Sequence, residues 1–116
     1  MKNLQNNFTT PEQSKRLLEL GVPADSADMY YHLENYQYYV RDEFSIKQND
    51  FFEFYKNIFY PCWSVGRLME ICKICEPKKY YEELCEELQW SQNYCVVIIS
   101  HIIANFPIID FSKLDD

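Results

Sequence analysis

The chain has 116 residues, of which 47% are hydrophobic and 17% aromatic, a composition typical of one folded domain rather than a disordered chain. Its formal net charge of −7 argues against duplex DNA or RNA as a partner, because 11 basic residues are scattered among 18 acidic ones. With 2 glycines, the chain has no Gly-rich phosphate-binding loop. We predict a single domain over residues 1–116, with residues 1–8 and 110–116 frayed.

The first predicted element is a short helix over Pro11–Leu20 whose two ends are both marked. Thr10 and Gln13 form a capping box, in which each side chain hydrogen-bonds the amide of the other residue. Pro11 stands at the first helical position, where its missing N–H costs nothing. Gly21 then supplies the left-handed conformation that ends a helix.

A tyrosine-rich hairpin follows this helix. Met29–Leu33 and Tyr36–Val40 have the composition of strands, and Glu34 with Asn35 forms the predicted turn between them. The stronger Asn-Gly turn signature is not present at this position.

The next twenty residues carry weaker signals. Arg41–Asp50 is polar and turn-like, although Phe44 and Ile46 alternate as they would on a short strand. Phe51–Tyr60 is ambiguous between strand and helix. We favour an extended segment, because the residue before Pro61 avoids the helical region.

Three helices are predicted in the second half of the chain. Ser64 caps a helix over Val65–Cys75, and a second helix covers Tyr80–Gln89. Ser91 caps Gln92–Ala104, whose β-branched centre also suits a buried strand; its length and cap favour a helix. Residues 106–116 are expected to form a loosely packed tail.

Together these elements predict an α+β fold with an N-terminal capped helix, a small antiparallel aromatic-rich sheet or hairpin, and two or three C-terminal helices. The longest strongly apolar run, Tyr94–Ile99, is too short to span a bilayer, so no membrane partner is expected. Residues 1–20 contain no apolar signal segment, and the five cysteines are an odd number. We therefore expect reduced thiols in a cytoplasmic protein.

Two segments resemble a known group of proteins. The run from Asn7 to Gly21 (NFTTPEQSKRLLELG) and the run from Pro61 to Ile71 (PCWSVGRLMEI) are similar to motifs of small uncharacterised proteins of gut Bacteroidetes and their phages and other mobile elements. In those proteins two strands and a last helix follow the second motif, whereas here Tyr80–Gln89 is predicted to be helical. The resemblance implies a mobile-element accessory protein and supplies no catalytic residue.

The cysteines raise the question of metal or redox chemistry. Cys72 and Cys75 form a CxxC pair, but no second close pair completes a structural zinc site. Both lie on the apolar stripe of a predicted helix, where a buried free cysteine is an ordinary core residue. A redox CxxC begins its helix, whereas this pair ends one. Cys85 and Cys95 stand alone. We therefore expect no metal and no cofactor.

Two further constellations are weaker. Cys62 just precedes a helix N-terminus, which would lower its thiol pKa, and a nucleophile pair with His101 is one hypothesis. The alternative is that Cys62 packs in the core. A run of four carboxylates could suggest a metal cluster, but they fit a hydrated helix face better: Glu82, Glu83, Glu86 and Glu87. We assign no catalytic residue.

Aromatic residues are concentrated between Met29 and Trp63. Successive side chains of a strand point to opposite faces, so the tyrosines of the hairpin cannot all face one core. Some rings must lie outside, or be covered by another element such as Phe51–Tyr60. The candidate interaction surface comprises Tyr30, Tyr36, Tyr38, Tyr39 and Trp63.

Three function hypotheses follow. The first is a non-catalytic cytoplasmic interaction protein that binds a protein partner or itself through the aromatic surface. The second is a small-ligand or nucleotide binder, which would need a pocket beside a tyrosine or tryptophan together with basic groups. The third is a thiol- or zinc-dependent enzyme.

Overall fold

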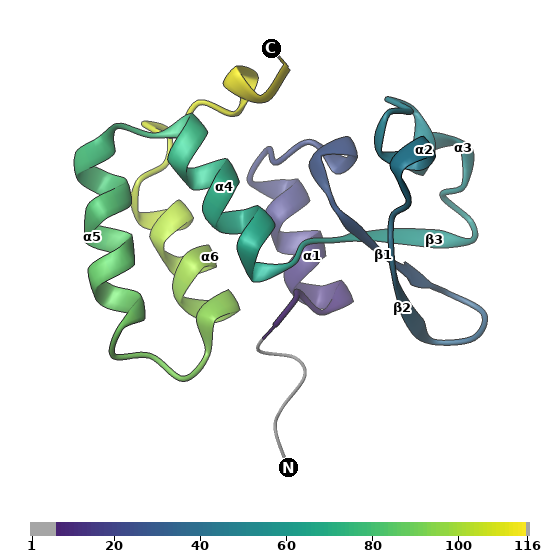
Figure 1. Ribbon diagram of the computed structural model, residues 1–116, viewed down its shortest axis with the longest axis horizontal. Helices are drawn as coiled ribbons and strands as arrows, with labels where there is room; N and C mark the ends of the chain where they lie inside the picture. The colour runs from purple at the N-terminus through teal and green to yellow at the C-terminus, as the bar shows by residue number, and fades with distance from the viewer. Residues whose placement is uncertain (1–6, 116) are drawn as a thin grey trace.

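The computed structural model describes residues 7–115, so the fraying expected for residues 1–6 and for Asp116 lies outside the described part. The fold is α+β (Figure 1). A three-stranded antiparallel sheet lies at one end of the molecule, and the helices α4 (Val65–Cys75), α5 (Lys78–Leu88) and α6 (Tyr94–Ala104) lie at the other. Helix α1 (Pro11–Glu19) lies between them and contacts both α6 (Tyr94–Ala104) and β3 (Phe59–Cys62).

The N-terminal helix α1 has the predicted caps. The Gln13 amide donates to Thr10 Oγ1 at 3.1 Å, and the Thr10 amide donates to Gln13 Oε1 at 3.0 Å. Gly21 adopts a positive φ of 102° directly after the helix. Leu17 packs fully buried in the core. Local signals alone therefore place this helix correctly.

The sheet has the order β2-β1-β3, with β1 (Met29–His32) in the centre. The predicted hairpin is present: β1 pairs with β2 (Gln37–Val40), and Tyr30 lies opposite Tyr39. The other side of β1 pairs with β3, where Tyr31 lies opposite Tyr60. Strand β2 is thus an edge strand, since β1 is its one sheet neighbour among the described residues.

The segment between β2 and β3 differs from the prediction. Residues 43–46 form a short helix, α2, instead of a turn or strand, because the Asp42 carboxylate accepts the Ser45 amide at 2.7 Å and caps it. Phe51–Phe54 forms a second short helix, α3, and only Phe59–Cys62 is extended. The residue before Pro61 is extended as predicted, but this preference concerns that residue alone and does not determine the conformation of Phe51–Phe54.

Arg41 explains why the chain folds over at this point. Its guanidinium is buried and donates to the carbonyls of Ala27 (2.9 Å) and Ser45. Its Cζ lies 4.8 Å and 4.9 Å from the ring centroids of Phe51 and Phe52. The arginine thus joins α2 and α3 to the loop that precedes β1.

The C-terminal half contains the predicted helices with small shifts of their boundaries. Ser64 caps α4 (Val65–Cys75), and α5 (Lys78–Leu88) begins two residues earlier than predicted. Helix α6 is a helix rather than a strand, but Asn93 caps it in place of Ser91.

The tail after α6 is packed in its described part, contrary to the loose tail expected. Ile109 is buried in the core, and the Asp110 amide donates to the Cys75 carbonyl at 2.8 Å. The 3-10 helix η3 (Phe111–Asp115) contacts α4. The apolar residues of this segment, Ile109, Phe111 and Leu114, therefore pack on the core and hold the end of the chain against α4.

Candidate functional site

One face of the sheet carries a continuous layer of aromatic rings. Tyr30 stacks on Tyr39 across β1 and β2, with ring centroids 5.4 Å apart. Tyr30 also contacts Phe59 of β3 at 4.5 Å, and Phe59 in turn contacts Tyr55 at 5.6 Å. Phe51 of α3 packs on this layer from the side, 5.7 Å from Tyr30 and parallel to Phe59. The segment 51–60 therefore covers part of this face.

The cover is incomplete. Tyr39 and Tyr55 remain exposed, and Phe54, whose ring lies 6.4 Å from that of Tyr55, is 81% exposed. These three rings are joined through half-buried Tyr30 and Phe59. We call the exposed group Tyr39, Phe54 and Tyr55 the aromatic patch.

Rings on the opposite face are more enclosed. Tyr38 lies 4.4 Å from Phe8 and 4.8 Å from Tyr31, measured between ring centroids. Burial raises the pKa of the Tyr38 hydroxyl to about 12, with smaller contributions from Cys62 and Tyr31. Tyr38 is therefore half-buried and presents only part of its ring to solvent.

Trp63 does not belong to the interaction surface proposed from the sequence. Its side chain is 0% exposed, and its indole N–H donates to Ser26 Oγ at 3.0 Å. The Trp63 amide also donates to Thr9 Oγ1 at 3.0 Å, and the Trp63 carbonyl accepts from the Thr9 amide at 2.9 Å. Its proximity to the tyrosines in sequence suggested a shared surface, whereas the chain turns Trp63 into the core after β3.

Tyr36 is the most exposed of the tyrosines proposed from the sequence. It closes the turn of the hairpin with a φ of 59°, a conformation that costs a residue with a Cβ more than it costs glycine, and its side chain is 71% exposed. Asn35 shapes the turn beside it by accepting the Gln37 amide at 3.1 Å. An exposed ring is therefore kept at a position that glycine or asparagine would fill with less strain.

Within residues 7–115, the outer edge of β2 has backbone groups that no other strand pairs. The Arg41 amide donates to the Asp28 carbonyl at 3.0 Å, which makes these two residues a hydrogen-bonded pair of the β1–β2 ladder. Because such pairs alternate in an antiparallel ladder, Tyr39 and Gln37 also face β1. The backbone N–H and C=O groups of Tyr38 and Val40 therefore point away from the sheet.

A hydrogen bond between β1 and β3 agrees with this alternation of inward-facing and outward-facing residues. The Leu33 amide donates to the Ile58 carbonyl at 2.8 Å, so the odd-numbered residues of β1 face β3 and the even-numbered ones face β2. Within residues 7–115, β1 is the one strand that pairs with β2, so the outward amides of Tyr38 and Val40 have no partner in the sheet. Val40, with its side chain 73% exposed, lies at the end of this free edge.

Sequence reasoning missed Val40, Phe54 and Tyr55 as surface residues. Phe54 and Tyr55 lay in a segment interpreted as a strand, and four-residue helices are too short to show a helical period. Val40 was assigned to the correct strand, but its exposure depends on β3 pairing with β1 instead of with β2.

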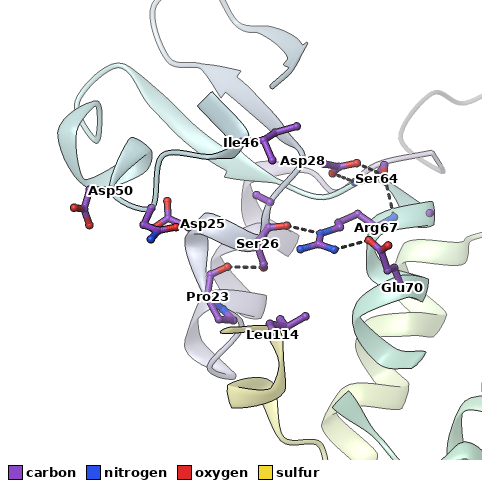
Figure 2. A pocket seen from close by; sticks show the side chains of 13 residues that line it. Pro23, Asp25, Ser26, Asp28, Ile46, Asp50, Ser64, Arg67, Glu70 and Leu114 are labelled. Carbon is purple, nitrogen blue, oxygen red and sulfur yellow. Dashed lines mark hydrogen bonds and ion pairs between the residues drawn. The ribbon is translucent and has the colours of Figure 1, made fainter. Parts of the chain in front are cut away.

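A cavity of about 1130 Å³ lies apart from the aromatic patch, between the 3-10 helix η2 (Ala24–Ser26), the first turn of α4 and the loop joining α2 to α3 (Figure 2). Its wall is an internal polar network. Asp28 accepts the Ser64 amide at 2.9 Å and the Ser64 hydroxyl at 2.6 Å. Arg67 Nε donates to the Ser26 carbonyl at 2.7 Å, and its Nη1 pairs with Glu70. These bonds fasten η2 to the start of α4.

This cavity does not have the features that a nucleotide site was expected to need. Its described lining contains no tyrosine or tryptophan, and Arg67, the one basic residue in that lining, is already bound. Asp25 adds a carboxylate whose pKa is raised mainly by burial, and its Oδ1 has no hydrogen-bond partner within the described chain. The cavity is acidic, and its ordered groups serve the fold.

The cysteines do not form the arrangements considered for an enzyme. Cys62 is buried and accepts a hydrogen bond from Ser14 Oγ at 3.5 Å, while His101 Nε2 lies 2.8 Å from Glu76 Oε1. The structure therefore does not bring Cys62 and His101 together. Burial raises the pKa of the Cys62 thiol to about 11, opposite to the lowering expected from the helix N-terminus.

The other cysteines are free thiols, and no metal-binding cluster is found in the described part of the chain. Cys72 and Cys75 are fully buried on α4, and burial raises the pKa of both thiols, that of Cys75 to about 11. All five cysteines are free. Within residues 7–115, no group of three or more His, Cys, Asp or Glu side chains is arranged to hold a metal ion.

Comparisons with known proteins leave the site to be interpreted from its own geometry. No family model, curated protein or solved structure matches this chain. In the part of the chain that the structure describes, none of the helices is both long and apolar enough to cross a membrane.

Proposed function

We propose that this protein is a non-catalytic binding module that recognises another protein through the aromatic patch and the free edge of β2. The observation that carries the proposal is the exposure of three connected rings beside an unpaired strand edge. Aromatic side chains are enriched at protein interfaces, where their large area is buried with little loss of conformational entropy.

The composition of β2 supports the same proposal. Edge strands of monomeric proteins are usually protected by charged residues, proline or bulges, because an open edge pairs with other strands. Strand β2 reads Gln-Tyr-Tyr-Val, so its four residues include no charged residue and no proline. An uncharged, aromatic strand at an open edge does not favour solubility, and we explain its composition by pairing with a partner.

The conformation of Tyr36 adds a second line of support. A residue with a Cβ in the left-handed region stores strain, which persists where the side chain has a use. A cytoplasmic location is part of this proposal and is supported by the five free cysteines, which fit a reducing compartment. An origin as a phage or mobile-element accessory protein is part of this proposal and is supported by the two sequence motifs alone.

The proposal is tested by affinity capture from cells of the native host, comparing the wild-type protein with Tyr39→Ser/Phe54→Ser. The double variant removes two exposed rings and is expected to lose the captured partner, because interface energy is concentrated in a few aromatic residues. Folding of each variant is checked by thermal unfolding.

The matched control is Trp90→Ser. Trp90 is the most exposed ring outside the patch, at 84%, and it closely follows α5 in sequence. Helix α5 lies at the opposite end of the molecule from the sheet (Figure 1). This variant is expected to capture the partner as well as the wild type. Capture that survives Tyr39→Ser/Phe54→Ser and is lost in Trp90→Ser would refute the assignment of the surface.

A further inference from the structure

We propose that the free edge of β2 binds an extended segment of a basic polypeptide as a fourth strand of the sheet. This inference rests on the proposed function and names the chemistry of the partner. Addition of a strand to an exposed sheet edge is a common mode of peptide recognition, in which backbone hydrogen bonds supply affinity and alternate side chains supply specificity.

The backbone of β2 is prepared for this addition. Tyr38 and Val40 each present an N–H donor and a C=O acceptor outward, and the two residues are about 7 Å apart along the strand. A partner strand in register satisfies all four groups. The β1–β2 ladder is untouched, because it uses the groups of Gln37, Tyr39 and Arg41.

Aromatic and apolar side chains lie beside this edge on both faces of the sheet, so apolar residues in the partner strand would pack well against them. On one face a partner residue would lie next to Tyr39, which leads into Tyr55 and Phe54. On the other face it would lie next to Tyr38 and the exposed Val40. Cross-strand pairs of aromatic and β-branched residues each contribute about 0.2–1 kcal/mol, so β-branched residues suit the partner.

Charge selects a basic partner. Glu34 lies in the turn before β2, and Asp42 follows the strand, so both ends of the free edge are acidic. Arg41, the basic residue that directly follows β2 in sequence, is buried, and its Nη1 and Nη2 groups donate to backbone carbonyls. With a chain net charge of −7, lysine or arginine at the ends of the added strand is attracted and acidic residues are repelled.

The same charges disfavour a second copy of this chain as the occupant. Two copies of β2 could pair antiparallel about a twofold axis in two registers, each of which pairs three residues of one copy with three of the other. The axis passes through Tyr38 in one register and through Tyr39 in the other. Either register brings Glu34 of one copy to within two strand positions of Asp42 of the other. Like charges at such positions oppose pairing, and two molecules of charge −7 also repel each other.

The test uses two capped, fluorescein-labelled peptides of equal strand propensity, KKTVTVTVKK and EETVTVTVEE, titrated with the protein and followed by fluorescence anisotropy. The basic peptide is expected to bind at least about tenfold more tightly than the acidic one, with affinity falling as salt rises. N-methylation of alternate residues removes the N–H groups from one edge of a peptide. One of the two alternate N-methyl sets is expected to abolish binding and the other to leave it unchanged.

A matched pair of protein variants tests the edge itself. Val40→Pro removes an outward N–H and leaves the ladder with β1 intact, because proline is tolerated on edge strands where its nitrogen faces solvent. Val40→Ala keeps the N–H and removes most of the side chain. We expect Val40→Pro to weaken binding of KKTVTVTVKK at least about tenfold and Val40→Ala to weaken it less. Circular dichroism and thermal unfolding verify that both variants fold.

Equal affinity for the two peptides, no binding of either, or equal effects of the two N-methyl sets would overturn the basic-strand proposal. A dimer detected by light scattering and broken by Val40→Pro would also overturn it and would make a second copy the occupant. These results are separable from failure of the proposed function. A host partner lost in Tyr39→Ser/Phe54→Ser but retained in Val40→Pro would leave the aromatic patch as the binding surface without strand addition.

Discussion

Replacing Trp63 with alanine is expected to lower the free energy of unfolding by about 3–5 kcal/mol, the range for truncating a large buried aromatic side chain. The Trp63 side chain is 0% exposed and packs in the core cluster with Leu68 and Ile98. Its removal leaves a cavity and also leaves Ser26 Oγ without the indole N–H that it accepts. Urea denaturation followed by circular dichroism measures the change.

Two controls separate this effect from a general sensitivity of the fold. Trp63→Phe retains most of the packing and is expected to cost less than the alanine variant. Trp90→Ala, at an exposed site, is expected to change the free energy of unfolding by no more than about 0.5 kcal/mol. Similar small losses for Trp63→Ala and Trp90→Ala would mean that Trp63 is a surface residue after all.

Replacing Arg41 with methionine is expected to lower the free energy of unfolding by about 3 kcal/mol or more. Methionine keeps an unbranched apolar stem but is shorter than arginine, and it removes every hydrogen bond of the guanidinium together with the contacts of Arg41 Cζ with the rings of Phe51 and Phe52. The Ala27 carbonyl would then lose the Arg41 donor, and the Ser45 carbonyl would keep backbone donors alone, among them the Gln48 amide at 3.2 Å. Because these bonds hold α2 and α3, the segment 42–58 is expected to become the first site of limited proteolysis.

The matched variant for Arg41 is Arg41→Lys, which keeps the charge and loses the planar fork of donors. It is expected to recover part of the stability lost in Arg41→Met. If Arg41→Met unfolds at the wild-type urea midpoint and resists proteolysis equally, the guanidinium does not hold α2 and α3 in place.

The elements that sequence analysis placed correctly are those with local signals. Helix α1 has a capping box at Thr10 and a terminal glycine at Gly21, and α4 has a serine cap followed by an apolar stripe. The hairpin was found from its tyrosine and valine content. Each of these signals acts between residues fewer than about five positions apart, so no knowledge of the rest of the fold was needed.

Errors arose where distant contacts decide the structure. Helices α2 and α3 depend on Arg41, which donates to the Ala27 carbonyl before β1 and to the Ser45 carbonyl in α2. The Asp42 cap was a local signal that could have been used. Trp63 was assigned to the surface because burial after β3 is a property of tertiary packing. The Cys62 thiol pKa was expected to fall, but burial outweighs the helix N-terminus.

The exposure of the candidate residues was predicted only in part. Tyr36 and Tyr39 are exposed as expected, whereas Tyr30 and Tyr38 are half-buried by neighbouring rings. The free edge could not be predicted, because its existence depends on β3 adding to the far side of β1. Alternation along a strand gives the faces of a hairpin, but it does not tell which strand lies at the edge.

Amide hydrogen exchange along β2, measured by NMR on the free protein and with a saturating concentration of KKTVTVTVKK, tests the central claim most directly. In the free protein we expect fast exchange at Tyr38 and Val40 and slow exchange at Tyr39, whose amide faces β1. The peptide is expected to slow exchange at Tyr38 and Val40. Slow exchange at Tyr38 and Val40 in a monomeric protein without peptide would contradict the claim, because the edge would then already be covered.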